Sequence, residues 1–274
     1  MLPRPRLSLR EFLETRCNFT SSIDWDKFVK WGDLTAARLD DKGVAYRRDY
    51  GRGVMLYYLV KLLKPERVVD VGTGRGYSAV CMLEALRSVH PASKFELFTV
   101  DTNSVYTKKS HLVYSRGSGE GYKAVKASVF QLMDKAVGMK GDVKFCKGES
   151  KAVLSCLRPG VGFVFVDGSH DFDDVMSDCS EAFKILDKGG VVVFHDYGEV
   201  GTTKAQEQRM PEVTRAIDKC IKDLSDRFDF VEVYTDGRVV ENPSSTVKDT
   251  FLYRYEVSGK MGSLVCFPRE GCNG

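Results

Sequence analysis

Short, continuous apolar runs alternate with amphipathic stretches through the middle of the chain. After Pro65 the apolar runs are RVVDV, LFTVD, DVKFC, GFVFVD and VVVFHD. Runs such as FVFV and VVVF are typical of central parallel strands that are buried on both faces. Because each run is followed by a segment with helical spacing, the pattern predicts an α/β fold.

Six segments carry the helical pattern. The first, residues 53–63, is apolar nearly throughout, as a buried helix would be, and Lys64-Pro65 ends it. The other five are Tyr77–Arg87, Lys123–Val137, Glu149–Cys156, Asp173–Leu186 and Pro211–Leu224. Two later runs, FDFVEVYT and TFLYRYEV, alternate more clearly and predict an antiparallel edge. The fold expected is a Rossmann-like, doubly wound and mostly parallel sheet of seven strands with an antiparallel edge strand.

The periodic pattern also suggests a division of the chain. Residues 1–50 lack sustained alternation and are expected to form an N-terminal helical cap on a main domain over 51–260, with 261–274 as a C-terminal tail. A flexible insertion is predicted at 115–121. The polar stretch 198–210 follows a strand end, where open α/β sheets bind ligands, and is therefore a candidate lid.

Composition narrows the class of protein. Hydrophobic residues make up 43% and charged residues 29% of 274, which is typical of a globular protein with a packed core. No apolar run is long enough for a membrane span and the first residues lack a secretory signal, so we expect a cytoplasmic protein without a membrane partner. The eight cysteines never form a C-x-x-C pair, which argues against a zinc site or a disulfide framework. A net charge of +3 does not favour nucleic acid as a partner, although arginines crowd the first fifth of the chain.

A glycine-rich turn follows the first strand of the expected sheet. It reads Asp70-Val-Gly72-Thr-Gly74-Arg-Gly76-Tyr77 and leads into a helix, so main-chain N–H groups there can approach a ligand closely. Such turns also serve nicotinamide and flavin enzymes. Here one residue separates the second and third glycines, Gly74 and Gly76, whereas the dinucleotide-binding motif G-x-G-x-x-G has two residues between them. A carboxylate at Asp70 would repel a pyrophosphate but would attract the cationic amino-acid end of S-adenosylmethionine.

Asp101 ends the next strand, at a suitable separation for an acid that accepts hydrogen bonds from ribose hydroxyls. A strand-end acid exposed on the surface is the alternative interpretation of this residue.

The segment 69–80 resembles motif I of the class I S-adenosylmethionine-dependent methyltransferases, and its Gly-Tyr-Ser-Ala-Val end is similar to the catechol O-methyltransferase branch. The resemblance extends over about residues 53–235. It implies that the methionine moiety lies against Gly72, Gly74, Tyr77 and Ser78, that Asp101 holds the ribose, and that the adenine borders a turn after the third strand. The residues expected to bind the cofactor are Asp70, Gly72, Gly74, Gly76, Tyr77, Ser78, Asp101, Gly148, Glu149 and Ser150.

Two strand ends carry both a carboxylate and an imidazole. Asp167 ends one strand with His170 three residues later, and His195-Asp196 ends the next. Adjacent parallel strands lie about 4.8 Å apart, so the two carboxylates can converge on Mg²⁺ or another hard divalent cation. The alternative is that both aspartates only cap loops or helices, and that His170 caps the helix near Asp173.

The run Asp-Gly-Ser-His-Asp-Phe, followed by Gly-Gly-Val-Val-Val-Phe-His-Asp-Tyr, is similar to a metal-using subfamily of methyltransferases. That subfamily includes the sugar O-methyltransferases of macrolide biosynthesis and the cephalosporin hydroxylase-like proteins. The resemblance implies that Asp167 and Asp196 bind the metal and that His170 is the base. His195 stands where some relatives have another acid, so it is either a third ligand or a residue that orients Asp196. The catechol branch differs, with lysine at the position of His170.

Three functions follow from these patterns. The leading hypothesis is a metal-assisted O-methyltransferase that uses S-adenosylmethionine and acts on a hydroxyl of a small molecule. The others are a metal-independent methyltransferase of RNA or protein, and a non-catalytic module that binds the cofactor. Acceptor specificity is expected to reside in residues 1–50, 103–122 and 198–210, because loops and caps carry specificity in such folds.

Overall fold

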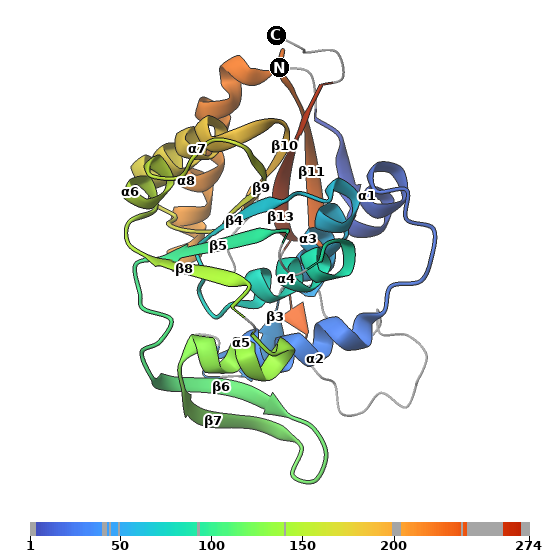
Figure 1. The fold of residues 1–274 in the computed structure, drawn as a ribbon, viewed down its shortest axis with the longest axis vertical. Coiled ribbons are helices and arrows are strands. Elements are labelled where there is room, and N and C mark those ends of the chain that lie inside the picture. Colours follow the sequence, from blue (N-terminus) through green and yellow to red (C-terminus); the bar gives the residue numbers. More distant parts are fainter. Residues whose placement is uncertain are drawn as a thin grey trace.

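An eight-stranded sheet forms the centre of the molecule (Figure 1). The structure is a computed structural model that describes residues 4–39, 43, 45–48, 50–91, 94–139, 141–198, 204–236, 238–239 and 260–269. In spatial order the strands are β1 (Arg6–Ser8), β11 (Phe228–Asp236), β13 (Lys260–Pro268), β10 (Leu186–His195), β9 (Val161–Val166), β4 (Arg67–Val71), β5 (Glu96–Asp101) and β8 (Val143–Lys147). β13 runs antiparallel to both of its neighbours, and the other pairings are parallel.

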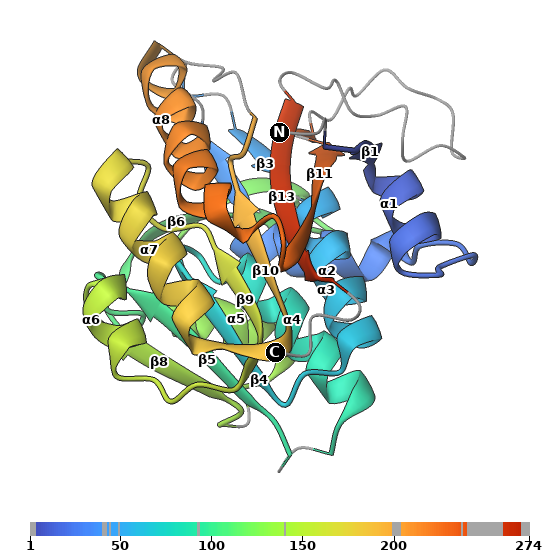
Figure 2. The same ribbon diagram turned by 90° about the horizontal axis from the view of Figure 1, so that it is seen from above.

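Helices cover both faces of this sheet (Figure 2). One layer consists of α1 (Leu9–Arg16), α2 (Trp25–Thr35), α3 (Tyr50–Leu63), α4 (Tyr77–Val89) and α5 (Val129–Val137). The other consists of α6 (Ser150–Ser155), α7 (Phe172–Ile185) and α8 (Lys204–Ile221), which is followed by a 3₁₀ turn at Lys222–Leu224. Alternate residues of the central strands enter different layers: Phe163 and Phe165 of β9 join the first core, and Val164 and Val166 join the second.

The predicted Rossmann-like α/β fold is confirmed, but the antiparallel strand lies inside the sheet and not at its edge. β13 occupies residues that we expected to belong to a tail, so that assignment does not hold for 261–268. The run FDFVEVYT is β11 as predicted, whereas TFLYRYEV lies outside the described residues. The sheet has eight strands because β1, from the expected cap, adds a parallel strand beside β11.

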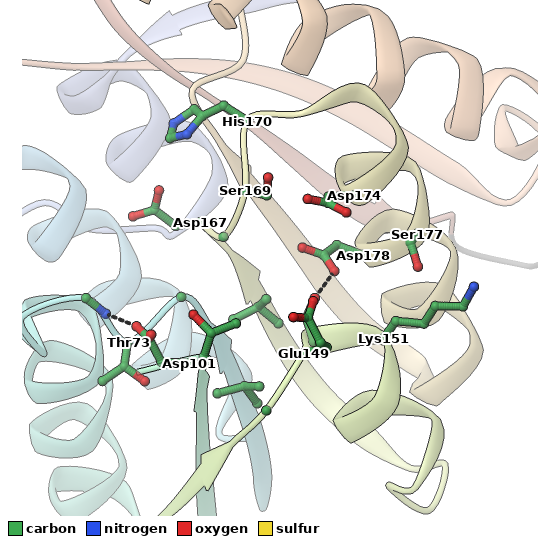
Figure 3. A pocket seen from close by; sticks show the side chains of 18 of the residues that line it. Thr73, Asp101, Glu149, Lys151, Asp167, Ser169, His170, Asp174, Ser177 and Asp178 are labelled. Carbon is green, nitrogen blue, oxygen red and sulfur yellow. Dashed lines mark hydrogen bonds between the residues drawn. The ribbon is translucent and has the colours of Figure 1, made fainter. Parts of the chain in front are cut away.

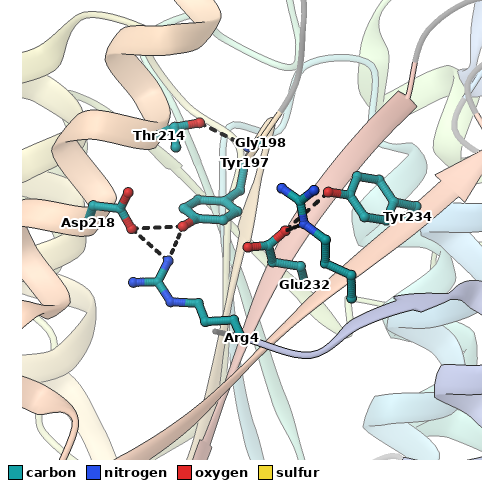
Figure 4. Close-up of polar contacts among 8 residues, drawn as sticks. Arg4, Tyr197, Gly198, Thr214, Asp218, Glu232 and Tyr234 are labelled. Atoms are coloured by element: carbon teal, nitrogen blue, oxygen red, sulfur yellow. Dashed lines mark hydrogen bonds and ion pairs between the residues drawn. The ribbon is translucent and has the colours of Figure 1, made fainter. Parts of the chain in front are cut away.

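The N-terminal segment is helical, as expected, but it is also tied into the sheet (Figure 4). Arg4 contacts the hydroxyl of Tyr197 and lies 2.6 Å from Asp218 Oδ1. Arg6 Nε lies 2.6 Å from Glu232 Oε2. These ion pairs hold β1 against β11 and hold the residues that follow β10, where the candidate lid was expected to begin. Of that lid, 204–210 belong to α8 and 199–203 lie outside the described residues.

The insertion after β5 is a hairpin, and this corrects one predicted helix boundary. β6 (Lys109–Ser115) and β7 (Gly121–Ala127) pair in register from Lys109–Ala127 to Ser115–Gly121. The helix predicted over 123–137 therefore begins only at Val129. Ser128 provides the physical reason, since its hydroxyl and the side chain of Gln131 form a reciprocal capping box that starts the helix there.

A small sheet lies beside the hairpin and the glycine-rich turn. It consists of β12 (Arg238–Val239), β3 (Ala45–Arg48) and β2 (Ala37–Leu39). Arg75 of the glycine-rich turn donates hydrogen bonds to the carbonyls of Ala37 in β2 and Leu112 in β6. One side chain therefore ties both flanking segments to the turn. Among the described helices, none is long and apolar enough to cross a membrane.

Candidate active site

A cavity of about 1100 Å³ opens at the carboxyl ends of β4, β5, β8 and β9 (Figure 3). This is the position at which open α/β sheets bind ligands. Of the residues expected to bind the cofactor, those that line the cavity are Gly72, Gly74, Tyr77, Ser78, Asp101, Gly148, Glu149 and Ser150. Asp167 and His170 line its other end. The cavity therefore joins the expected cofactor site to the expected catalytic residues.

The glycine-rich turn brings the main chain of β4 close to that of β9. Gly72 has φ of 92°, and a Cβ atom there would lie 1.9 Å from the carbonyl oxygen of Asp167. Only glycine fits this position, both for its conformation and for its space. The N–H groups of Gly72 and Thr73 donate to the carbonyl of Val100, and that of Gly76 donates to the carbonyl of Thr73. The turn is therefore held tightly where it lines the cavity.

Asp101 at the end of β5 fixes the other side of the turn. Its carboxylate accepts hydrogen bonds from the main-chain N–H of Gly74 at 2.9 Å and of Asn103 at 2.7 Å. The main chain of Gly148 donates to the Asp101 carbonyl at 3.0 Å, which brings the turn after β8 alongside. The structure thus places Asp101 between the glycine-rich turn and the expected adenine border.

Asp70 and Gly76 do not line the cavity, in contrast to the expectation. Asp70 is fully buried, and its carboxylate accepts hydrogen bonds from Ser78 Oγ at 3.0 Å and Thr99 Oγ1 at 2.9 Å. Burial raises the pKa of Asp70 to about 7, although both hydroxyls oppose that shift. The Asp70 carboxylate therefore links β4 to α4 and β5 inside the core and does not face the cavity. Gly76 faces α5, where an added Cβ would lie 2.4 Å from Met133 Sδ.

Three donor atoms meet beyond the expected methionine end of the cavity. His195 Nδ1 lies 3.3 Å from Asp167 Oδ1 and 2.9 Å from Asp196 Oδ1. One ligand atom from each of these residues lies within 4.8 Å of the others. The fold brings them together because β9 and β10 are parallel neighbours that end at the same edge. Asp196 has φ of 57°, a left-handed conformation that aspartate tolerates better than most residues.

His170 joins this group from the loop after β9. Its Nε2 lies 2.7 Å from Asp196 Oδ2. The hydrogen bond to Asp196 raises the pKa of His170, although burial opposes the shift. If Nε2 carries the proton shared with Asp196, Nδ1 is the nitrogen that remains to accept a proton.

The electrostatics of the group are those of a tightly coupled cluster. Burial disfavours the charge on His195, but the carboxylates of Asp196 and Asp167 outweigh it and raise the pKa of His195 to about 10. Burial would raise the pKa of Asp167, yet His195 and Arg52 hold it below its usual range. Two carboxylates can therefore remain ionised in a buried place because cations surround them.

Arg52 is the residue of this group that sequence reasoning missed. It lies near the start of α3, and its Nη1 is 2.5 Å from Asp167 Oδ2. No motif marks it, because α3 and β9 are far apart in the chain. The signal available was a charged residue directly before the apolar run 53–63, where a buried partner should be sought.

The donor set suits a small divalent cation. Two carboxylate oxygens and an imidazole nitrogen converge, and neither nitrogen of His195 makes a hydrogen bond although both are buried. Nδ1 faces the two carboxylates without hydrogen-bond geometry, which is how a ligating nitrogen would lie. Oxygen-rich sets with one imidazole accept Mg²⁺, Mn²⁺ or similar ions.

Comparison with known proteins places this site in a family. A family model described as a methyltransferase domain matches residues 69–197, a segment that is a little under half of the chain. The matched segment runs from the glycine-rich turn to Tyr197 and contains every residue that lines the cavity except Arg38 and Arg52.

Solved structures share the fold of this protein over nearly its whole length. PaMTH1 of Podospora anserina, bound to S-adenosylhomocysteine, matches with a TM-score of 0.55 and 16% identity, covering 95% of both chains. The O-methyltransferase TomG of Streptomyces achromogenes, in complex with S-adenosylmethionine, has a TM-score of 0.53 and 17% identity, covering 94% of this chain and 93% of its own. At these identities the likeness shows the fold alone, which is that of the class I S-adenosylmethionine-dependent methyltransferases.

A sequence relative among curated proteins is the uncharacterized protein R132 of Acanthamoeba polyphaga mimivirus. It is 30% identical over 99 residues, which is 33% of this chain. The match spans 41% of the relative's own length, so it carries no statement about the whole protein.

Proposed function

We propose that this protein transfers the methyl group of S-adenosylmethionine to a hydroxyl oxygen of a small molecule, with a divalent cation at Asp167, His195 and Asp196. The observation that carries the proposal is the convergence of these donors beside His170 at one end of the cavity. Structural neighbours named as O-methyltransferases support the choice of oxygen as the acceptor atom.

The chain's own residues would position the donor. The main chain of the glycine-rich turn would lie against the amino-acid part, and Asp101 would offer its carboxylate to the ribose. Gly148, Glu149 and Ser150 would border the adenine. S-adenosylmethionine supplies a methyl group that is already activated as a sulfonium. The protein then has to align the acceptor oxygen in line with the transferred carbon and exclude water.

His170 is the proposed base. It would accept the hydroxyl proton of the acceptor at its ring, while Asp196 holds the other side of the imidazole at 2.7 Å. A bound divalent cation makes a nearby hydroxyl easier to deprotonate. Because Asp196 raises the pKa of His170, the neutral base is formed only at higher pH than for a free imidazole. The rate should therefore rise with pH through that raised pKa.

Calorimetric titration of Mg²⁺ into ion-free protein saturated with S-adenosylhomocysteine tests the metal. We expect saturable binding that the Asp196→Asn variant loses, while its affinity for S-adenosylhomocysteine stays unchanged. Asparagine suits this test because it also tolerates the left-handed conformation of residue 196. Unchanged Mg²⁺ binding in the variant would show that the metal binds at a site that does not include Asp196.

Absence of binding in both proteins would remove the metal from the proposal. In that case RNA or protein becomes the better acceptor, and salt-dependent RNA binding becomes the next measurement. Transfer of radiolabelled methyl groups to a panel of small diols and catechols, with and without Mg²⁺, tests the acceptor class directly.

A further inference from the structure

Arg52 is held in one place at the edge of the proposed metal site. Its side chain is 8% exposed, and its guanidinium lies 5.6 Å from the ring centre of Phe165. It makes an ion pair with Asp167, from Nη1 to Oδ2 at 2.5 Å. A guanidinium remains protonated at any physiological pH, so this anchor is a permanent charge.

The two oxygens of Asp167 have different partners. Oδ2 faces Arg52, whereas Oδ1 faces His195 Nδ1 at 3.3 Å. The main chain of Asp167 is already fixed, because its N–H donates to the carbonyl of Val71 at 2.8 Å. Rotation of the carboxylate is therefore the main freedom left to this residue, and the contact with Arg52 removes it.

We propose that Arg52 is a positioning residue that holds Asp167 with Oδ1 turned toward His195 and Asp196, so that the three donors converge before an ion arrives. The inference rests on the proposed function for the identity of the site. Residues that bond to the far side of a ligand typically change metal affinity 10–100-fold when they are removed. Removal of Arg52 would instead increase metal affinity if repulsion between the guanidinium and the ion outweighed the positioning of Asp167.

Mn²⁺ provides a spectroscopic measurement of this effect, since its electron paramagnetic resonance signal reports the free ion directly. We expect Arg52→Gln to weaken Mn²⁺ binding about 10–100-fold in the presence of S-adenosylhomocysteine. Arg52→Lys should recover part of that loss, because an ammonium group still pairs with Oδ2 but lacks the planar fork. The affinity of both variants for S-adenosylhomocysteine should stay within about threefold of wild type, which also shows that they are folded.

Arg87→Gln is the matched control. Arg87 pairs with Asp142, from Nη2 to Oδ2 at 2.6 Å, and both side chains are largely buried, but neither lines the cavity. Loss of a partly buried arginine–aspartate pair as such should therefore leave Mn²⁺ affinity unchanged. Mn²⁺ binding by Arg52→Gln that equals or exceeds wild type would overturn the inference.

A crystal structure of ion-free Arg52→Gln tests the same inference without any metal, and the Arg52→Met protein, which likewise cannot pair with Asp167, replaces it if the glutamine variant does not fold. We expect the Asp167 carboxylate to rotate away from His195. An unchanged carboxylate would overturn the positioning role. If wild-type protein binds no Mn²⁺, the metal part of the proposed function fails, and this crystallographic comparison alone decides the role of Arg52.

Discussion

The two ends of the cavity are built in different ways. At the cofactor end, the turn between β4 and α4 lines the cavity with its main chain, and Asp101 accepts a hydrogen bond from that turn. At the other end, side chains converge from α3, from the loop after β9 and from the end of β10. The glycine-rich turn at the first end is local in sequence, whereas the side chains at the second end come from segments more than a hundred residues apart. Changes at the first end should therefore alter cofactor affinity, and changes at the second should alter turnover.

Replacement of His170 should give the largest effect on turnover with little effect on cofactor affinity. We expect His170→Ala to lower kcat about 10²–10⁴-fold, the usual contribution of a general base. Its affinity for S-adenosylhomocysteine, measured by calorimetry, should stay within about threefold of wild type. The remaining activity should also lose the acidic limb of the pH–rate profile that the raised pKa of His170 produces.

His90→Ala is the control for that variant, because His90 contacts the main-chain carbonyls of Lys64 and Pro65 away from the cavity. It should turn over like wild type. Wild-type turnover in His170→Ala would show that His170 is not the base. A large loss of cofactor affinity in the same variant would show that the two ends of the cavity do not act separately.

The buried carboxylate below the glycine-rich turn should affect stability in a pH-dependent way. The folded pKa of Asp70, about 7, lies above the value near 4 expected in the unfolded chain. The folded state therefore binds the proton more tightly, and the free energy of unfolding should fall as pH rises from about 4 to about 7 and stay reduced above that. Asp70→Asn removes this group and should gain roughly 2–4 kcal/mol relative to wild type over that range.

Thermal and urea unfolding of wild type and Asp70→Asn between pH 5 and pH 9 measure the effect. Only the change in the difference between the two proteins matters, since asparagine also alters the hydrogen bonds with Ser78 and Thr99. A difference that is constant with pH would show that Asp70 has no raised pKa in the folded protein.

The smallest of these effects is expected at Asp101. Asp101→Asn should weaken binding of S-adenosylhomocysteine about tenfold, because the carboxylate that bonds to Gly74 and is proposed to hold the ribose loses charge and one acceptor. At saturating cofactor kcat should change little. Asp142→Asn, at a carboxylate remote from the cavity, serves as the control. A fall in kcat without a change in affinity for S-adenosylhomocysteine would show that Asp101 acts in turnover and not in cofactor binding.

The residues expected to bind the cofactor come from three short stretches, the glycine-rich turn, Asp101 and residues 148–150, and each lies at the end of a strand that the sequence pattern marks. Eight of the ten residues expected there line the cavity. Asp70 was misplaced, since strand alternation turns its side chain into the core, where Ser78 and Thr99 hold it. At the other end, the pairing of two strand ends predicted that Asp167, His195 and Asp196 would meet, but not that Arg52 would join them from a helix more than a hundred residues away in sequence.

The same contrast holds for the fold. Buried parallel strands have continuous apolar runs, so the alternation of strands and helices along the chain could be predicted from the sequence. The hairpin of β6 and β7 was not, because its alternation is weak and only partner strands reveal it. The position of β13 was equally hidden, since a strand's sequence does not state which neighbours it will have.

β13 also has a consequence for the order of events during synthesis. It separates β10 from β11, although it is made after both. Until residues 260–268 have emerged from the ribosome, each of those strands has one open edge where β13 will pair. Pairing of residues 260–268 with both strands therefore closes two edges at once and joins β1 and β11 to the rest of the sheet.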